Sequence, residues 1–382
     1  MDKIKICGIT TRPDTAKVML PTLSYVAEKG YESFLICQPC DTFKSIAPIT
    51  YIPVEMGRGA VSPIEVLKCT YRLYKVFRQQ KFDVVQYASS NAGLYASIAA
   101  WLAHVPVRIF CQWGIPYTDY TGIKMKFFKF MEYFTCLLST SVQPDSHLNL
   151  EWAIREGLFK SEKGVVLGKG SAQGVSMERF DIRKKAAWKD EIRKQYQIPD
   201  NVKVFSFVGR IVPQKGVNEL IKAFLRIDRK DIYLFIIGAP DEIESLDQPL
   251  LAKVKDMDNV VFTGSISDPE RYLAASDFFV LPSYREGFPN TILEAGALGI
   301  PSIVTRINGM IDLIIDGETG FVCEIKSIDT LYDAMNKVLS QTEREYKMMS
   351  DKVYATVKNN FDAEYIKECF YQNRQELVNK SK

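Results

Sequence analysis

The sequence lacks any run of the roughly 18 to 20 uninterrupted apolar residues that a membrane-spanning helix requires. Its first residues, MDKIKICGIT, lead into strand-like alternation without the apolar segment of a signal peptide. The eight cysteines are scattered and do not have the dense spacing of a disulfide framework. We therefore expect a protein that is made and kept in the reducing cytoplasm.

Short-period repeats and low-complexity tracts are also missing. With 382 residues, 47% of them hydrophobic and 25% charged, the chain has the composition of a globular protein with room for two domains. Its formal net charge is only +3, but residues 1–190 hold 25 Lys and Arg against 17 Asp and Glu, whereas the remainder holds 24 against 29. The first half is therefore the basic one, although we expect no nucleic-acid partner.

Three familiar motifs are absent or incomplete. No GxGxxG follows the first expected strand, which argues against a dehydrogenase. The segment GKGSAQG, residues 168–174, does not have the spacing of a phosphate-binding P-loop, and we expect a loop near a domain junction. A single CxxC, CQPC at residues 37–40, cannot complete a tetrahedral zinc site.

The sequence contains only two histidines, His104 and His147. His104 is expected at a helix-to-strand connection and His147 at a helix start, in structural or capping roles.

What the sequence does contain is an alternation of strand-like and helix-like segments in both halves. This rhythm predicts an α/β fold of two Rossmann-like, doubly wound domains facing across a cleft. We expect one domain over residues 1–190 and a second over residues 191–360. Residues 361–382 are expected to form a C-terminal helix that crosses back to the first domain.

The segment VGRIVPQKG, residues 208–216, places two cations around a turn between a strand and a helix. Arg210 follows the strand, and Lys215 precedes Gly216 at the start of the next helix. Cations beside a helix N-terminus form an anion site. The alternative is a pair of ordinary surface cations, and the pattern does not distinguish phosphate from a carboxylate partner.

A second segment, YREGFPNTILEA, residues 284–295, follows another expected strand and begins another helix. Pro289 suits the first helical position. The amides of residues 287–291 would be available to a diphosphate, with Glu286 and Glu294 at its two ends directed to sugar hydroxyls. The alternative is an acid near a helix N-terminus and an acid on a helix face. Together, the two segments indicate a nucleotide diphosphate that carries a sugar.

With these segments, the sequence resembles a retaining glycosyltransferase of family 4, with the two-domain GT-B architecture, and in particular the bacterial surface-polysaccharide glycosyltransferases. VGRIVPQKG, VFTG, SDFFVLPSYREGFPNTILEAGALGIPSIVT and DGETGFV carry the resemblance in the family's order and spacing. The long third motif is specific, and the others alone are not.

The resemblance implies that the domain over residues 1–190 binds the acceptor and that the domain over 191–360 binds the nucleotide sugar. It also implies a role for each matching residue. Arg210 and Lys215 would hold the donor diphosphate, Glu286 would contact the transferred sugar, and Glu294 would bind the ribose. The turn that would cradle the sugar and phosphates consists of Gly287, Phe288, Asn290 and Thr291. No metal or other cofactor is expected, because protein charges and the helix dipole neutralise the leaving group.

The sequence departs from the family at two places in the first half. Many members carry a histidine after a mid-domain strand, where this chain has RIFCQWGIPYTDY. Gln112, Trp113 or Asp119 is expected to line that region. The family's glycine-rich first turn is replaced by ITTRPDTAKVMLPTL, and this makes residues 10–12 (Thr10, Thr11 and Arg12) candidates on the acceptor side.

The segment GIKMKFFKFMEYFTCLL, residues 122–138, alternates lysines with large apolar side chains. One interpretation is a core helix with a solvated basic edge. The other is a basic, aromatic surface that lies on anionic lipid. We favour the second, and therefore expect a peripheral protein on the inner face of the cytoplasmic membrane with a lipid-linked oligosaccharide acceptor.

The predicted function is transfer of a hexose or N-acetylhexosamine from a UDP-sugar. Use of a GDP-sugar, or a UDP-sugar epimerase of the same architecture, remains open. A phosphorylase would need a cofactor-lysine segment that the sequence does not show. A non-catalytic nucleotide-sugar-binding module is disfavoured by the four intact charged residues, Arg210, Lys215, Glu286 and Glu294.

Overall fold

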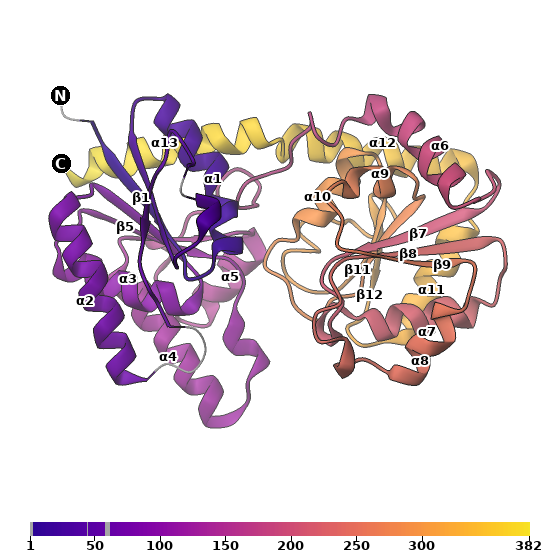
Figure 1. The fold of residues 1–382 in the computed structure, drawn as a ribbon, viewed down its shortest axis with the longest axis horizontal. Coiled ribbons are helices and arrows are strands. Elements are labelled where there is room, and N and C mark those ends of the chain that lie inside the picture. The colour runs from indigo at the N-terminus through magenta and orange to yellow at the C-terminus, as the bar shows by residue number, and fades with distance from the viewer. Residues whose placement is uncertain (1–2, 44, 58–61) are drawn as a thin grey trace. The chain divides into compact units, whose positions relative to one another are not determined.

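The computed structural model describes residues 3–43, 45–57 and 62–382 (Figure 1). The chain forms two compact units, one of Met1–Gln173 with Glu364–Lys382 and one of Gly174–Ala363. The division therefore precedes the boundary expected at residue 190. Segment 174–181 belongs to the second unit because Val175 pairs with Asp362 and Phe180 enters that unit's core.

The first unit is built on a parallel six-stranded sheet with the order β3-β2-β1-β4-β5-β6. Its strands are β1 (Lys5–Ile9), β2 (Glu32–Cys37), β3 (Thr50–Pro53), β4 (Val84–Ala88), β5 (Val107–Gln112) and β6 (Ser141–Pro144). The helices are α1 (Pro13–Glu28), α2 (Pro63–Gln80), α3 (Ser90–Leu102), α4 (Gly122–Leu138), α5 (His147–Arg155) and α13 (Ala363–Ser381).

Successive residues of a strand point to opposite sides of the sheet. Because apolar side chains lie on both sides of this sheet, helices cover both of its faces. Helices α2, α3 and α4 cover one face, and α1 and α13 cover the other (Figure 1). Along β2, Phe34 and Ile36 join the core on the first side, while Leu35 packs on the second. On the α13 side, buried Arg374 donates to Gln86 Oε1 at 2.7 Å and Gln143 Oε1 at 2.8 Å. These bonds join the last helix to strands β4 and β6.

The second unit repeats the design with the sheet order β12-β11-β10-β7-β8-β9. Its strands are β7 (Lys203–Val208), β8 (Ile232–Ile237), β9 (Val260–Gly264), β10 (Phe278–Leu281), β11 (Ser302–Thr305) and β12 (Gly320–Cys323). The helices are α6 (Lys185–Gln195), α7 (Val217–Ile227), α8 (Gln248–Lys255), α9 (Pro269–Ala274), α10 (Asn290–Ala297), α11 (Ile328–Leu339) and α12 (Glu343–Asn360).

The helices of the second unit also form two layers. Helix α9 packs with α6 and α10, and α10 packs with α12, whereas α7 packs with α8 and α11 on the other face (Figure 1). Local sequence sets several helix starts. In α12, Thr342 and Glu345 form a reciprocal capping box. Pro289 is the N-cap of α10, one residue before the helical position expected for it.

In both units the second and third strands add to one side of the first strand, and the later strands add to its other side. The strand order reverses between β1 and β4 in the first unit, and between β7 and β10 in the second. In open α/β sheets, ligands bind outside the carboxyl ends of the strands at such a reversal. A ligand site is therefore expected in the loops that follow these four strands.

Candidate functional site

The loop after β7 carries both predicted cations. Arg210 is exposed, and Lys215 is the last residue of a 3-10 turn, Pro213–Lys215. Gly216 follows with φ of +70°, and a Cβ there would lie 2.1 Å from the carbonyl oxygen of Pro282. Only glycine fits this approach. The close packing brings the loop after β7 against the chain that leaves β10.

A backbone hydrogen bond makes the same connection between the two loops. Tyr284 N donates to the carbonyl oxygen of Gln214 at 2.8 Å. Lys215 and Glu286 follow these two residues by one and two positions, so the bond fixes their backbones side by side. The reversal point of the second sheet is therefore a single structured unit.

Lys215 and Glu286 form an ion pair at this point. The side chains are only 21% and 13% exposed, so the pair is partly withdrawn from solvent. Because an ammonium and a carboxylate lie side by side here, the pair suits a ligand that has an anionic group next to hydroxyl groups. Lysine contacts phosphate as a point charge, and a carboxylate accepts hydrogen bonds from hydroxyls.

The turn after Glu286 leads into helix α10. Phe288 packs against Phe361, with ring centroids 5.5 Å apart. Asn290 and Thr291 are the first two residues of α10, and both are partly buried. The first amides of a helix have no partner within the helix, and the helix dipole favours an anion beside them.

A further loop, which the sequence did not single out, supports this turn. Gly309 lies in the segment after β11 with φ of +81°, and a Cβ there would lie 1.7 Å from the carbonyl oxygen of Gly287. The Gly309 amide also donates to Asp312 Oδ2 at 3.0 Å. The loop after β11 thus packs directly against the Gly287 turn. The sequence does show a glycine here, Gly309 in the segment RINGM, but the pattern does not reveal that it contacts Gly287, which is distant in sequence.

Glu294 lies on α10 in an environment that disfavours its charge. Burial raises its pKa to about 7, Arg179 acts to lower it, and Glu270 acts to raise it. The Arg179 guanidinium binds Glu270 Oε2 through Nε at 3.1 Å and Nη2 at 2.9 Å, and also binds the carbonyl of Ser267. Sequence reasoning did not find Arg179 or Glu270, because nothing in the pattern placed them near α10.

In the first unit, two of the three acceptor-side candidates are used within the fold. Thr10 is fully buried, and its hydroxyl donates to the carbonyl of Arg12 at 3.0 Å. Thr11 is also buried, with its hydroxyl 3.5 Å from that of Ser89 in the loop after β4. Arg12 is exposed and lies 3.5 Å from Asp14. Of these candidates, Arg12 is the one whose charged group reaches solvent.

The segment in place of the family histidine is also partly internal. Gln112 is only 1% exposed, and its Nε2 donates to Glu132 Oε1 of α4 at 2.8 Å. Burial raises the pKa of Glu132 to about 7. Trp113 is partly buried against the core on the α1–α13 side, and the side chain of Asp119 lies outside the described part of the structure. Trp113 is therefore better placed than Gln112 to line a site.

The remaining motifs have structural explanations. His147 begins helix α5, and its Nε2 lies 3.4 Å from the carbonyl of Gly168, while His104 has φ of +58° in the connection before β5. Cys37 and Cys40 are both unpaired, and burial raises the pKa of Cys37 to about 11, so its thiol stays protonated.

Within residues 3–43, 45–57 and 62–382, no group of three or more His, Cys, Asp and Glu side chains is arranged to hold a metal ion. In that same part of the chain, no helix is both long enough and apolar enough to cross a bilayer.

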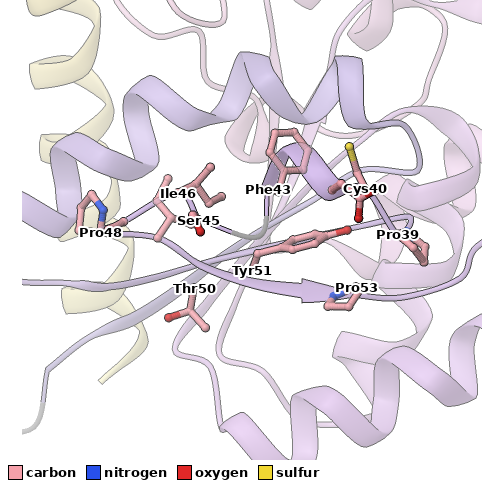
Figure 2. Close-up of a pocket in the computed structure, with 12 residues that line it drawn as sticks. Pro39, Cys40, Phe43, Ser45, Ile46, Pro48, Thr50, Tyr51 and Pro53 are labelled. Atoms are coloured by element: carbon pink, nitrogen blue, oxygen red, sulfur yellow. The ribbon is translucent and has the colours of Figure 1, made fainter.

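A hollow of about 1060 Å³ lies beside the edge strand β3, lined by side chains of the segment 39–53 (Figure 2). Phe43 and Tyr51 line it and pack edge to face, with ring centroids 5.6 Å apart. Strand β2 separates β3 from β1, where the strand order reverses. Among the described residues that line the hollow, there is no grouping of charged side chains comparable to the Lys215–Glu286 pair, so cavity size alone does not locate the site.

Two family descriptions match the chain: "Glycosyl transferase 4-like" over residues 12–142 and "Glycosyl transferases group 1" over residues 189–355. The capsular polysaccharide biosynthesis glycosyltransferase CapM of Staphylococcus aureus is 31% identical over 372 residues, which is 96% of each chain. An Escherichia coli enzyme, UDP-Gal:alpha-D-GlcNAc-diphosphoundecaprenol alpha-1,3-galactosyltransferase, is 27% identical over 94% of each chain.

Solved structures agree on the fold. A glycosyltransferase from Rickettsia africae superposes with a TM-score of 0.77 at 19% identity, covering 100% of this chain and 99% of the other. Anabaena HepE in complex with UDP-glucose gives a TM-score of 0.78 at 16% identity, covering 98% of this chain and 100% of the other. These likenesses confirm the predicted GT-B fold of two Rossmann-like units.

Proposed function

This chain is a group 1, family 4-like glycosyltransferase, and from that premise we propose that it moves a hexose or N-acetylhexosamine from a UDP-sugar to a lipid-linked oligosaccharide. We infer that the reaction retains the anomeric configuration and serves the synthesis of a cell-surface polysaccharide. The observation that carries the proposal is the Lys215–Glu286 pair at the strand reversal of the second unit.

The charges around this pair suit a sugar nucleotide. The Lys215 ammonium and the exposed Arg210 guanidinium would bind the diphosphate, together with the first amides of α10. The Glu286 carboxylate would exchange its lysine partner for hydroxyls of the transferred sugar. Glu294, further along α10, would accept hydrogen bonds from the ribose hydroxyls. The turn of Gly287, Phe288, Asn290 and Thr291 would lie between them.

The chemistry that we propose needs no second carboxylate. The bond between the sugar C1 and the diphosphate oxygen breaks as the acceptor oxygen approaches from the same face. The acceptor proton passes to the departing phosphate oxygen. Charge that develops on this phosphate is stabilised by Lys215 and Arg210, a type of contribution that reaches several kcal/mol per group.

The choice of donor and acceptor rests on relatives. HepE is solved with UDP-glucose, and the Escherichia coli relative uses UDP-Gal and a diphosphoundecaprenol-linked acceptor, as its name states. The name of a Campylobacter jejuni relative, 24% identical over 84% of this chain, likewise specifies a diphospho-undecaprenol acceptor. An acceptor of this kind would bring the basic first unit to the inner membrane surface.

The test is nucleotide release. Purified protein is incubated with UDP- and GDP-sugars, with and without a membrane extract, and release of UDP or GDP is measured. We expect acceptor-dependent release from one UDP-sugar. Conversion of the UDP-sugar without acceptor would identify an epimerase, release from a GDP-sugar would change the donor, and binding without turnover would identify a non-catalytic module.

A matched pair of variants ties the result to the site. Lys215→Ala should abolish release while the protein stays folded. Lys352→Ala removes a cation from another ion pair of the same unit, with Glu318, and should leave release unchanged. Turnover of Lys215→Ala at the wild-type rate would remove Lys215 from the proposed site.

A further inference from the structure

Helices α2, α3 and α4 share an outer surface that is unusually apolar. Helix α3 packs against both α2 and α4 on one face of the first sheet (Figure 1). Ten large apolar side chains on these three helices are more than 40% exposed: Ile64, Leu67, Tyr71, Trp101, Leu102, Ile123, Phe127, Phe130, Tyr133 and Leu137. The outer surface of these helices, defined by these ten residues, is called here the α2–α4 face.

On α4 the exposed side chains follow the helical repeat. Ile123, Phe127 and Phe130 are separated by four and three residues, so they lie on one stripe, and Ile123 is 87% exposed. The buried residues Glu132, Thr135 and Cys136 lie on the opposite side of α4, and buried Met131 lies at the border between the two sides. The helix therefore has an apolar side toward the core and a second apolar side toward solvent. The first side packs in the core of the unit, whereas the second is largely exposed.

Helix α2 shows the same arrangement, which the sequence pattern alone did not single out. Ile64, Leu67 and Tyr71 are separated by three and four residues and are 57% to 70% exposed. The buried residues of the same helix include Leu73 and Phe77, which pack into the core below. Two helices on either side of α3 thus both direct an apolar stripe outward.

The charges on these helices are almost all positive. Helix α3 has no charged residue. The cations of the other two are Lys68, Arg72, Lys75, Arg78, Lys124, Lys126 and Lys129. The acids of the two helices are Glu65 and Glu132, and Glu132 is buried. Large apolar side chains among cations match the interface of a bilayer with anionic headgroups. A second copy of the chain docked face to face would place these cations against one another.

We propose that the α2–α4 face lies on an anionic lipid bilayer, with Ile64, Leu67, Ile123, Phe127 and Phe130 reaching the acyl boundary and the lysines among the headgroups. This inference rests on the proposed function for the reason the enzyme visits a membrane, namely an acceptor that is anchored there. The face itself is defined by the exposed side chains.

The experiment is flotation of the full chain with two kinds of vesicle, phosphatidylcholine alone and an equal mixture with phosphatidylglycerol. Three variants are compared. One replaces Ile123, Phe127 and Phe130 by Ser, one replaces Lys124 and Lys126 by Gln, and the control replaces Ile315 and Met348, two exposed apolar residues of the second unit, by Ser. Thermal unfolding verifies that each variant is folded.

Wild type and the control should float with the anionic vesicles. The triple Ser variant should lose about tenfold or more in partitioning, because three buried apolar side chains are removed. The Lys124→Gln, Lys126→Gln variant should lose up to about thirtyfold in partitioning, because two cations contribute about 1 kcal/mol each, and also part of its salt sensitivity. Equal flotation of the triple variant and wild type would overturn the proposal.

Two further outcomes have defined meanings. If light scattering shows a wild-type dimer that the triple variant converts to monomer while flotation is unchanged, the face binds a second copy and the membrane assignment is wrong. Nucleotide release in detergent without vesicles should be the same for the triple variant and wild type. Vesicle binding without any nucleotide release by wild type would reject the proposed function and keep the membrane face.

Discussion

The two units of this protein have the same sheet order but different chemistry at the equivalent positions. Numbered from its own first strand, each sheet runs 3-2-1-4-5-6. In the second unit, the loops after the first and fourth strands bring together Lys215 and Glu286. In the first unit, the equivalent loops bring together the hydroxyls of Thr11 and Ser89, with Thr11 buried.

This difference shows that the scaffold fixes where a site can form, and the loop residues decide whether it does. Helices α2 and α4 of the first unit together carry seven cations, an arrangement that suits a surface rather than a reaction centre. The division of labour that we infer is a membrane-facing first unit and a donor-binding second unit. The predictions below test whether the two reversal points really differ in this way.

The largest expected effect is on turnover. Glu286→Gln and Lys215→Met should each lower kcat/KM for nucleotide release by about 10²- to 10³-fold, because each would remove a proposed polar contact to the donor in a partly buried site. The equivalent changes in the first unit, Thr11→Val and Ser89→Ala, should have less than about a threefold effect, since they remove a neutral contact. A large loss in the second pair would mean that both reversal points take part in the reaction.

The second prediction concerns the turn that begins at Gly287, which is proposed to bind the donor and is called here the donor turn. Gly309→Ala should lower the free energy of unfolding by about 2 to 4 kcal/mol and weaken UDP binding, because the added methyl meets the carbonyl of Gly287. Gly317→Ala is the matched control, since it has a similar φ of +76° with no atom within 4 Å of the added Cβ. It should cost only about 1 kcal/mol from backbone strain. Urea unfolding and calorimetric titration with UDP measure both quantities.

An equal loss of stability in the two glycine variants would show that the backbone conformation dominates and that the Gly287–Gly309 contact adds nothing. The contact would then not be needed to hold the donor turn. A Gly309→Ala variant that loses stability but keeps its affinity for UDP would separate packing from binding.

Local patterns predicted the elements of this fold well, because strand and helix periodicity and helix starts are local properties. The positions of Arg210, Lys215 and Glu286 after strands could also be predicted, because parallel strands bring their carboxyl ends to one edge. The Lys215–Glu286 ion pair and the contact of Gly309 with Gly287 could not, because each joins loops whose packing depends on the whole sheet.

Two other features show the same limit. A residue at a strand end can point toward the site or toward a covering helix, and Gln112 points to Glu132 of α4. The division after residue 173 rather than near 190 depends on the pairing of Val175 with Asp362, which are far apart in sequence. The roles of Arg210, Lys215, Glu286 and Glu294 in binding the donor stay predictions that the variants above test.

The third prediction separates the first unit from the second by its pH dependence. The pKa of buried Glu132 rises from 4.5 in the unfolded chain to about 7 in the fold, so the folded state binds the proton more tightly. The contribution of Glu132 to stability is therefore greatest below pH 4.5 and falls as the pH rises through 7, by about 3 kcal/mol in all. Glu132→Gln removes this loss.

Urea unfolding at pH 5 and pH 8 provides the measurement. Relative to wild type, Glu132→Gln should gain about 2.5 kcal/mol more at pH 8 than at pH 5, because part of the loss has already occurred at pH 5. Glu156→Gln, which changes a partly exposed acid in the same unit, should keep the wild-type difference. If Glu132→Gln also keeps it, then the burial of Glu132 does not set the pH dependence of this unit.

The smallest expected effect belongs to Glu294 in the second unit. Its pKa of about 7 means that the carboxylate loses its charge as the pH falls from 8 to 6, and a protonated acid accepts hydroxyl hydrogen bonds less well. The affinity for UDP-glucose, measured by calorimetry, should fall by up to about tenfold over this range, since one pKa unit corresponds to 1.36 kcal/mol.

Glu294→Gln should bind UDP-glucose more weakly than wild type at pH 8, and its affinity should change little with pH. Glu132→Gln should keep the wild-type pH dependence of donor binding. If instead it abolishes that dependence, the titrating group lies in the first unit, and the assignment of ribose binding to Glu294 fails.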